Sequence, residues 1–295
     1  MLKIVNCSVT ELTPRLGGLF CANKLMTKFA LVKRGVEIDP ATFAKASLDT
    51  LITQDKFIGA IQFFNVENND QEADYATSVT KERRLTMPGT KGYTFTFDKG
   101  SCFQNELAKL DGSEQYAFIP IFDDGSALFA VKKNGKLTGF DANLFVGVMQ
   151  LRTTADLAGS TLMVDITPNA MTYWQKSSAV YESDEFSFGE LNPVAGVRIV
   201  PQAVAVGTST VVNVTNLCSD AVVTGLTDDE NWMLERDGVL EAITAVSEVA
   251  GKYTLTHAAL VASQKVRFLL YKAGYLVYVL DTNYYAGESD VKTVA

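Results

Sequence analysis

Apolar and polar residues alternate strictly between residues 93 and 98. Tyr93, Phe95 and Phe97 are separated by two threonines, so apolar side chains recur with a period of two. This period is typical of a β-strand with one buried and one solvated face. Further apolar runs follow, divided by turn-forming Asp-Asp-Gly (123–125) and Asn-Gly (134–135) sequences. The pattern predicts a meander of antiparallel strands at 91–98, 116–122, 127–131, 137–149 and 161–166, with a short helix at 101–110.

The residues before this meander predict one more helix between two strands. Asp39 and Pro40 suit a helix start, because aspartate caps free amides and proline fits the first helical position. Apolar residues then recur at helical spacing to residue 53. The flanking apolar runs predict strands at 29–33 and 57–66.

Residues 67–84 break the apolar pattern. This stretch is polar and rich in turn-forming residues, with few apolar anchors. Long loops are uncommon in compact domains and tend to be functional or disordered. Two interpretations stay open: a loop that contacts a partner, or the solvated tip of a hairpin.

The chain divides into four parts by pattern. Residues 1–166 form a β-rich assembly domain, and residues 167–196, with mixed aromatics and no clear period, a connector packed on it. Seven short apolar runs between 197 and 282 predict an immunoglobulin-like (Ig-like) β-sandwich. The polar residues 283–295 are expected to form a flexible tail. The predicted fold class is therefore mainly β: a sandwich- or barrel-like first domain with one or two short helices, followed by an Ig-like sandwich.

Composition and charge narrow the possible partners. The 295 residues carry a formal net charge of −8, which argues against a partner held through phosphate contacts. No apolar run approaches the roughly 20 residues needed to cross a bilayer. We therefore expect no specific nucleic-acid binding and no membrane association. The N-terminus lacks a secretory signal pattern, so we expect a protein made in a cytoplasm, with all four cysteines reduced.

Residues capable of catalysis are sparse. His257 is the only histidine, so one chain cannot supply a Ser-His-Asp triad or a multi-histidine metal site. The acidic runs at 123–124 and 228–230 fit turn formation better than paired catalytic carboxylates or calcium ligation. Trp174 and Trp232 could form a sugar-binding platform, but core packing explains them more simply. We predict no catalytic residue, no metal site and no cofactor.

The layout resembles bacteriophage virion proteins. The features that carry the resemblance are the early helix, the polar excursion, the run Met-Pro-Gly-Thr-Lys-Gly-Tyr-Thr-Phe-Thr-Phe at 87–97 and the Ig-like segment after it. This order is similar to the tail-tube proteins of long-tailed phages. It is also similar to auxiliary capsid proteins of phages infecting Bacteroidota, where residues 97–104 and 136–141 have counterparts.

The resemblance implies a function without catalysis. The chain would be a virion structural protein, made in the host cytoplasm, that assembles with copies of itself and with other virion proteins. A tail-tube subunit is the first expectation and an auxiliary (decoration) protein of the capsid the alternative. The net negative charge is compatible with both. The Ig-like domain would contact the host surface weakly, and a carbohydrate-binding or adhesion module is the further alternative.

The polar excursion and the strand after it are the expected assembly interface. Both can reach a neighbour by strand addition, in which main-chain hydrogen bonds join two sheets. The residues are Glu67, Asn68, Asp70, Glu72, Tyr75, Arg83, Arg84, Tyr93, Phe95 and Phe97.

Overall fold

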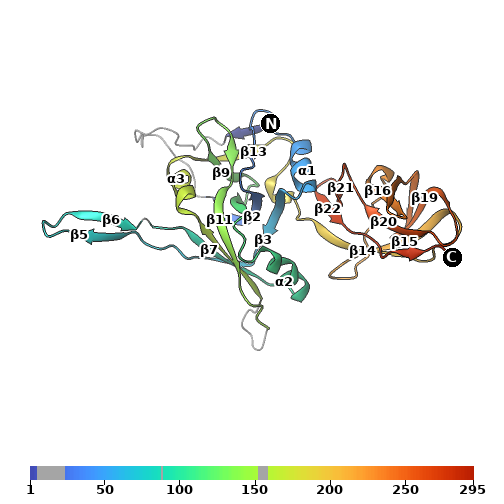
Figure 1. Cartoon of the computed structure of the whole chain (residues 1–295). Helices are drawn as coiled ribbons and strands as arrows, with labels where there is room; N and C mark the ends of the chain where they lie inside the picture. Colours follow the sequence, from blue (N-terminus) through green and yellow to red (C-terminus); the bar gives the residue numbers. More distant parts are fainter. Residues whose placement is uncertain (5–23, 88, 152–158) are drawn as a thin grey trace. The chain divides into compact units, whose positions relative to one another are not determined.

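The computed structural model describes residues 1–4, 24–87, 89–151 and 159–295 (Figure 1). The chain splits into two compact units. The first consists of Met1–Leu48 and Lys56–Glu190, and the second of Asp49–Asp55 and Leu191–Ala295. Strands dominate both units, which confirms the predicted mainly β class.

One large antiparallel sheet organises the first unit. Its strand order is β1-β13-β9-β8-β11-β12-β7-β4, with β10 on β9, β2 on β8 and β3 on β2. The strands of this sheet are β1 (Leu2–Ile4), β2 (Met26–Lys33), β3 (Phe57–Gln62), β4 (Asn65–Asn68), β7 (Gly92–Phe97), β8 (Tyr116–Phe122), β9 (Ala127–Val131), β10 (Leu137–Thr138), β11 (Phe140–Val146), β12 (Ser160–Ile166) and β13 (Ser178–Ser183). Strands β5 (Asp74–Thr77) and β6 (Arg83–Met87) form a separate pair. The helical segments are α1 (Lys45–Thr53), whose residues from Asp49 on belong to the second unit, α2 (Ser101–Leu107), η1 (Ala108–Leu110), α3 (Pro168–Lys176) and η2 (Phe188–Glu190).

The strands predicted between residues 91 and 166 are present and antiparallel, but they do not pair in chain order as a meander: β7 pairs with β12 and β4, and β11 pairs with β8. Their apolar faces form the core. Phe95 of β7 is fully buried, with its ring centroid 4.4 Å from that of Phe29 on β2 and 5.8 Å from that of Phe118 on β8. Strands β2 and β7 are not paired with each other, so the sheet must curve to bring these rings together. This arrangement is the barrel-like core expected from the sequence.

Two local predictions in this unit differ from the structure. The helix expected from residue 39 begins at Lys45, because Asp39 closes a turn instead. Its carboxylate accepts the Ala41 N–H at 3.0 Å and its carbonyl accepts the Phe43 N–H at 3.0 Å. The predicted connector contains α3, whose first turn is capped by Thr167, and β13, which pairs with β1 and β9. These residues therefore belong to the first sheet and its covering helix.

The second unit is a β-sandwich. One sheet has the order β18-β19-β15-β14-β22-β21 and the other β17-β16-β20-β23. Trp232 of β16 and Tyr253 of β19 meet between the sheets, with ring centroids 5.7 Å apart. The elements are β14 (Ala195–Pro201), β15 (Gly207–Asn216), η3 (Asp229–Asn231), β16 (Trp232–Arg236), β17 (Val239–Ala242), β18 (Ala245–Val249), β19 (Lys252–Leu260), β20 (Lys265–Leu270), β21 (Tyr278–Leu280), β22 (Asn283–Ala286) and β23 (Lys292–Thr293).

The C-terminal residues are part of this sandwich, so the prediction of a flexible tail is wrong. Strand β22 lies between β14 and β21, and β23 pairs with β20. Tyr284 is fully buried and Val294 is 2% exposed. Only two short strands with few apolar residues are involved, and their partners are distant in sequence. The local pattern therefore gave no signal for them.

Candidate assembly interface

The polar excursion forms a β-hairpin, which we call the arm (residues 74–87). Strands β5 and β6 pair only with each other in the described chain, with Tyr75 opposite Leu85 and Thr77 opposite Arg83. Figure 1 shows the arm extending away from the rest of the first unit. Of the two interpretations of the polar excursion, the hairpin therefore describes its structure correctly.

The arm exposes apolar side chains that have no core to pack on. Tyr75 and Leu85 are each 56% exposed, and Val79 at the turn is fully exposed. The Arg83 guanidinium lies 5.8 Å from the Tyr75 ring centroid, a cation–π contact on the surface of the arm. An isolated two-stranded hairpin is marginally stable in water. A partner that covered these side chains would stabilise the arm.

A tight turn closes the arm. The Ser78 N–H donates to the Glu82 carbonyl at 2.9 Å and the Lys81 N–H donates to the Ser78 carbonyl at 2.9 Å. Lys81 has φ of +64°, the left-handed conformation expected at the last position of a three-residue hairpin loop. This turn places Val79, Lys81 and the following arginines at the end of the arm, which we call the tip (residues 78–84).

Polar contacts join the base of the arm (residues 70–73 and 89–91) to the sheet. Lys91 Nζ lies 2.7 Å from the Asp70 carboxylate and 3.2 Å from the Asn68 side-chain oxygen. Gln71 and Thr90 exchange two backbone hydrogen bonds of 3.0 Å. A Cβ on Gly89 would lie 2.8 Å from the Gln71 carbonyl oxygen, so glycine permits this close approach of the two segments.

A groove of about 440 Å³ lies between the base of the arm and α3. Met171 and Trp174 of α3 contribute its apolar surface, and both are partly exposed. Asp70 and Glu72 contribute carboxylates from the base. The remaining lining residues are Gln71, Ala73, Gly89, Thr90, Lys91 and Gln175. The groove therefore combines an apolar surface with a charged side, on which Asp70 is paired with Lys91 and Glu72 is exposed.

The predicted interface residues fall into two groups. Those on β4, the base and the arm are exposed: Glu67, Asn68, Asp70, Glu72, Tyr75, Arg83 and Arg84. Tyr93, Phe95 and Phe97 are 8%, 0% and 1% exposed and belong to the core. Strand β7 pairs with β12 on one side and β4 on the other, so the prediction that this strand reaches a neighbour by strand addition is wrong. Alternation shows that one face of a strand is buried, but it does not show which strands flank it. The edge is β4.

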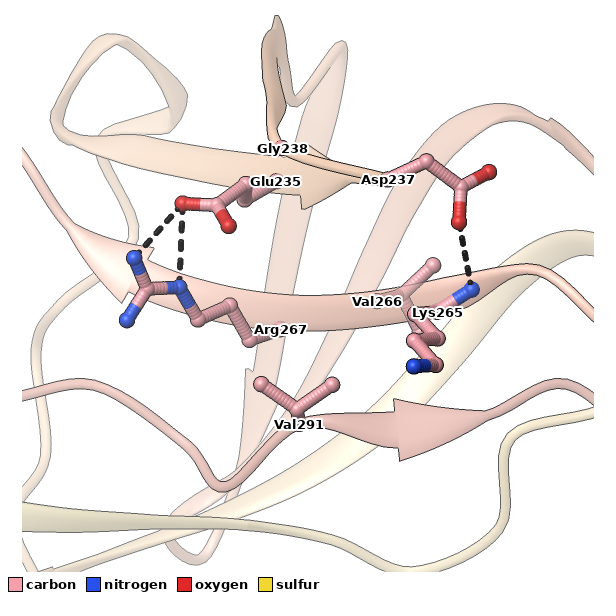
Figure 2. A pocket seen from close by; sticks show the side chains of 7 residues that line it. All are labelled: Glu235, Asp237, Gly238, Lys265, Val266, Arg267 and Val291. Carbon is pink, nitrogen blue, oxygen red and sulfur yellow. Dashed lines mark hydrogen bonds and ion pairs between the residues drawn. The ribbon is translucent and has the colours of Figure 1, made fainter.

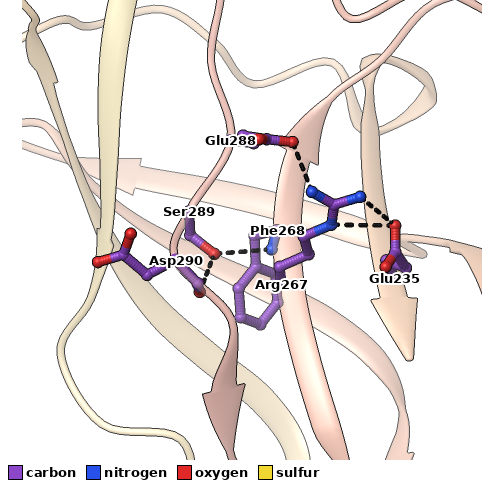
Figure 3. Close-up of polar contacts among 6 residues, drawn as sticks. All are labelled: Glu235, Arg267, Phe268, Glu288, Ser289 and Asp290. Atoms are coloured by element: carbon purple, nitrogen blue, oxygen red, sulfur yellow. Dashed lines mark hydrogen bonds and ion pairs between the residues drawn. The ribbon is translucent and has the colours of Figure 1, made fainter. Parts of the chain in front are cut away.

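A second pocket, of about 360 Å³, lies on the four-stranded sheet of the second unit (Figure 2). The Arg267 guanidinium donates to Glu235 at 2.7 and 3.0 Å and to Glu288 at 2.8 Å (Figure 3). The Asp237 carboxylate accepts the backbone N–H of Lys265 at 2.9 Å. The arginine of β20 is thus paired with carboxylates of β16 and of the segment before β23. This pattern favours a structural role in joining the three segments.

The other candidate residues also serve the fold. His257 is 3% exposed; its Nδ1 donates to the Ala258 carbonyl at 2.9 Å, and its Nε2 lies 2.9 Å from the Thr210 hydroxyl. Asp124 forms an ion pair with Lys24 and accepts the Ser126 N–H at 3.0 Å within its turn. Asp228 accepts the Glu230 N–H at 3.2 Å and caps η3. No three His, Cys, Asp or Glu residues in the described chain are placed to hold a metal ion.

Two further findings concern cysteines and membranes. Cys102 and Cys218 are both disulfide-bonded, so the prediction that all four cysteines are reduced is wrong; Cys7 and Cys21 lie outside the described residues. Disulfide formation depends on spatial proximity, which sequence spacing alone did not reveal.

Within the described residues, no helix has the length and apolar character to span a bilayer.

No protein-family model matches the chain, and no curated protein shows significant similarity to it.

Proposed function

We propose that this chain is a non-enzymatic structural subunit of a bacteriophage virion, a tail-tube subunit in the first instance, that assembles with copies of itself through the arm. The observation that carries the proposal is the arm itself. It pairs with no other strand in the described chain, and it exposes Tyr75, Val79 and Leu85 to solvent. Burying these side chains on a neighbour would provide a hydrophobic driving force for assembly.

The edge of the large sheet supports the same proposal. Strand β4 pairs with β7 on one side only within the described chain, so its other side offers backbone donors and acceptors. Sheet edges of this kind accept strands from other chains, and closed rings of subunits remove them. The virion assignment itself rests on the resemblance of the 87–97 run and of the domain order.

An auxiliary capsid protein is the alternative that the arm supports equally, because shells and tubes both use repeated contacts. The sugar-binding alternative receives less support. Trp232 is fully buried, and its indole N–H donates to the Leu226 carbonyl at 2.8 Å. Trp232 is therefore not available as a stacking platform, which leaves Trp174, partly exposed in the groove, without the second tryptophan of the expected pair.

The test is removal of the arm from the full chain. Residues 74–87 are replaced by a short Gly-Ser linker, and the particle mass is measured by analytical ultracentrifugation together with negative-stain microscopy. We expect the unaltered chain to form rings, tubes or shells and the variant to remain a folded monomer. The control is Val249→Ser, which alters an apolar residue 77% exposed on the second unit. Unchanged assembly of the arm-deleted chain would contradict the proposal.

A further inference from the structure

We propose that the groove beside the arm is the receptor for the arm tip of a second copy of this chain. This inference rests on the proposed function and deepens it by naming both surfaces of one contact. The tip comprises residues 78–84. The groove lies between the base of the arm and α3.

Charge is the first observation, because the two surfaces have opposite sign. Three cations, Lys81, Arg83 and Arg84, stand at the tip beside one carboxylate, Glu82. The Arg84–Glu82 separation is 3.9 Å with both side chains more than two-thirds exposed, so this pair leaves the cations largely open to solvent. At the groove, Glu72 is exposed and makes no ion pair within the described chain. The Asp70 carboxylate is paired with Lys91 at 2.7 Å, so Glu72 gives the groove its net negative charge.

Shape and polarity are the second observation. Val79 projects fully exposed from the tip, between polar and charged neighbours. The groove presents Met171 and Trp174. An apolar side chain on a tip with a net positive charge therefore corresponds to an apolar surface beside the Glu72 carboxylate. Contacts with a buried centre and a charged rim are typical of protein interfaces.

The occupant must come from another molecule. A strand rises about 3.4 Å per residue, so the arm carries Val79 about 17 Å beyond Asp74. Figure 1 shows the tip at the far end of the arm, whereas the groove lies at its base. A paired hairpin cannot fold back on itself over that length. Each subunit thus offers one tip and one groove, and the contact can be repeated from copy to copy.

The experiment exchanges the charges. Arg83→Glu with Arg84→Glu reverses the tip, and Glu72→Lys reverses the groove. The association constant of the full chain is measured by sedimentation velocity. We expect each change alone to weaken association about tenfold or more, as close charge pairs at interfaces can provide this energy. A chain carrying all three changes should recover much of the loss. Val79→Ser should weaken association without changing the charge.

The control is Lys133→Glu, which reverses an exposed lysine remote in sequence from the tip and groove. Three outcomes separate the two proposals. Rescue by the combined changes supports the tip-to-groove contact. Association that depends on the arm but not on Glu72 overturns this contact and leaves the proposed function standing. Association that survives deletion of the arm overturns both.

Discussion

At the scale of single residues, aromatic side chains of the first unit divide by environment. Phe95 packs against the rings of Phe29 and Phe118, whereas Tyr75 is more than half exposed on the arm. Phe95 lies in a strand that alternates apolar and polar positions, whereas the strand of Tyr75 reads Asp-Tyr-Ala-Thr and is exposed throughout. Substitution of Phe95 should therefore affect mainly stability, and substitution of Tyr75 mainly assembly.

We expect Phe95→Ala to destabilise the first unit by about 3–5 kcal/mol, because it removes a buried ring and leaves a cavity. Tyr75→Ala should leave the urea unfolding midpoint unchanged and weaken association. Chemical denaturation and sedimentation on the same two variants check this. A Phe95→Ala variant that is stable but fails to assemble would instead show that Phe95 contributes to the assembly interface.

The carboxyl group of Asp165 supplies a pH-dependent prediction. Burial raises its pKa, so ionisation destabilises the folded state. The penalty is present well above the folded-state pKa and disappears once the pH falls below the unfolded value near 3.8. Asp165→Asn should therefore raise the melting temperature at pH 7, and the gain should vanish toward pH 3. A gain that persists at pH 3 would contradict this assignment.

At the scale of elements, the final residues complete the second unit. Val294 is buried, and its N–H and C=O bond to Gln264 and Ser263 at 2.9 and 3.0 Å. Deleting residues 291–295 should lower the free energy of unfolding of this unit by about 2 kcal/mol, largely through loss of the valine. Urea unfolding followed by the fluorescence of buried Trp232 measures this. Val291→Ser, at a position 58% exposed, is the control and should have little effect.

Elements with strong local patterns were predictable, and those that depend on distant partners were not. The period-two alternation located β7, and continuous apolar runs located β8 and β9. Strands β22 and β23 contain few apolar residues and are positioned by β14 and β20. The seven exposed interface candidates follow from the polarity of residues 67–84. The groove could not be predicted, because α3 and the base are brought together only by the fold.

At the scale of the whole molecule, the boundary between the units falls after Glu190, six residues before the end of the predicted connector. Residues 49–55 belong with the second unit, where Asp49 accepts the Tyr284 hydroxyl at 2.5 Å. We expect a fragment of residues 191–295 to fold cooperatively and remain monomeric, since it contains both sheets and their shared core. Calorimetry and sedimentation test this. A fragment that oligomerises would place an assembly surface on the second unit.

The unpaired outer sides of β5 and β6 have a consequence for free subunits. A solvent-exposed hairpin with open edges can template unlimited, indiscriminate strand stacking, as in fibrils. Lys81, Arg83 and Arg84 place like charges on every arm, and repulsion between them acts as a gatekeeper against such stacking. The cations that we propose to direct a tip into an acidic groove would thus also keep newly made subunits soluble until a groove is available.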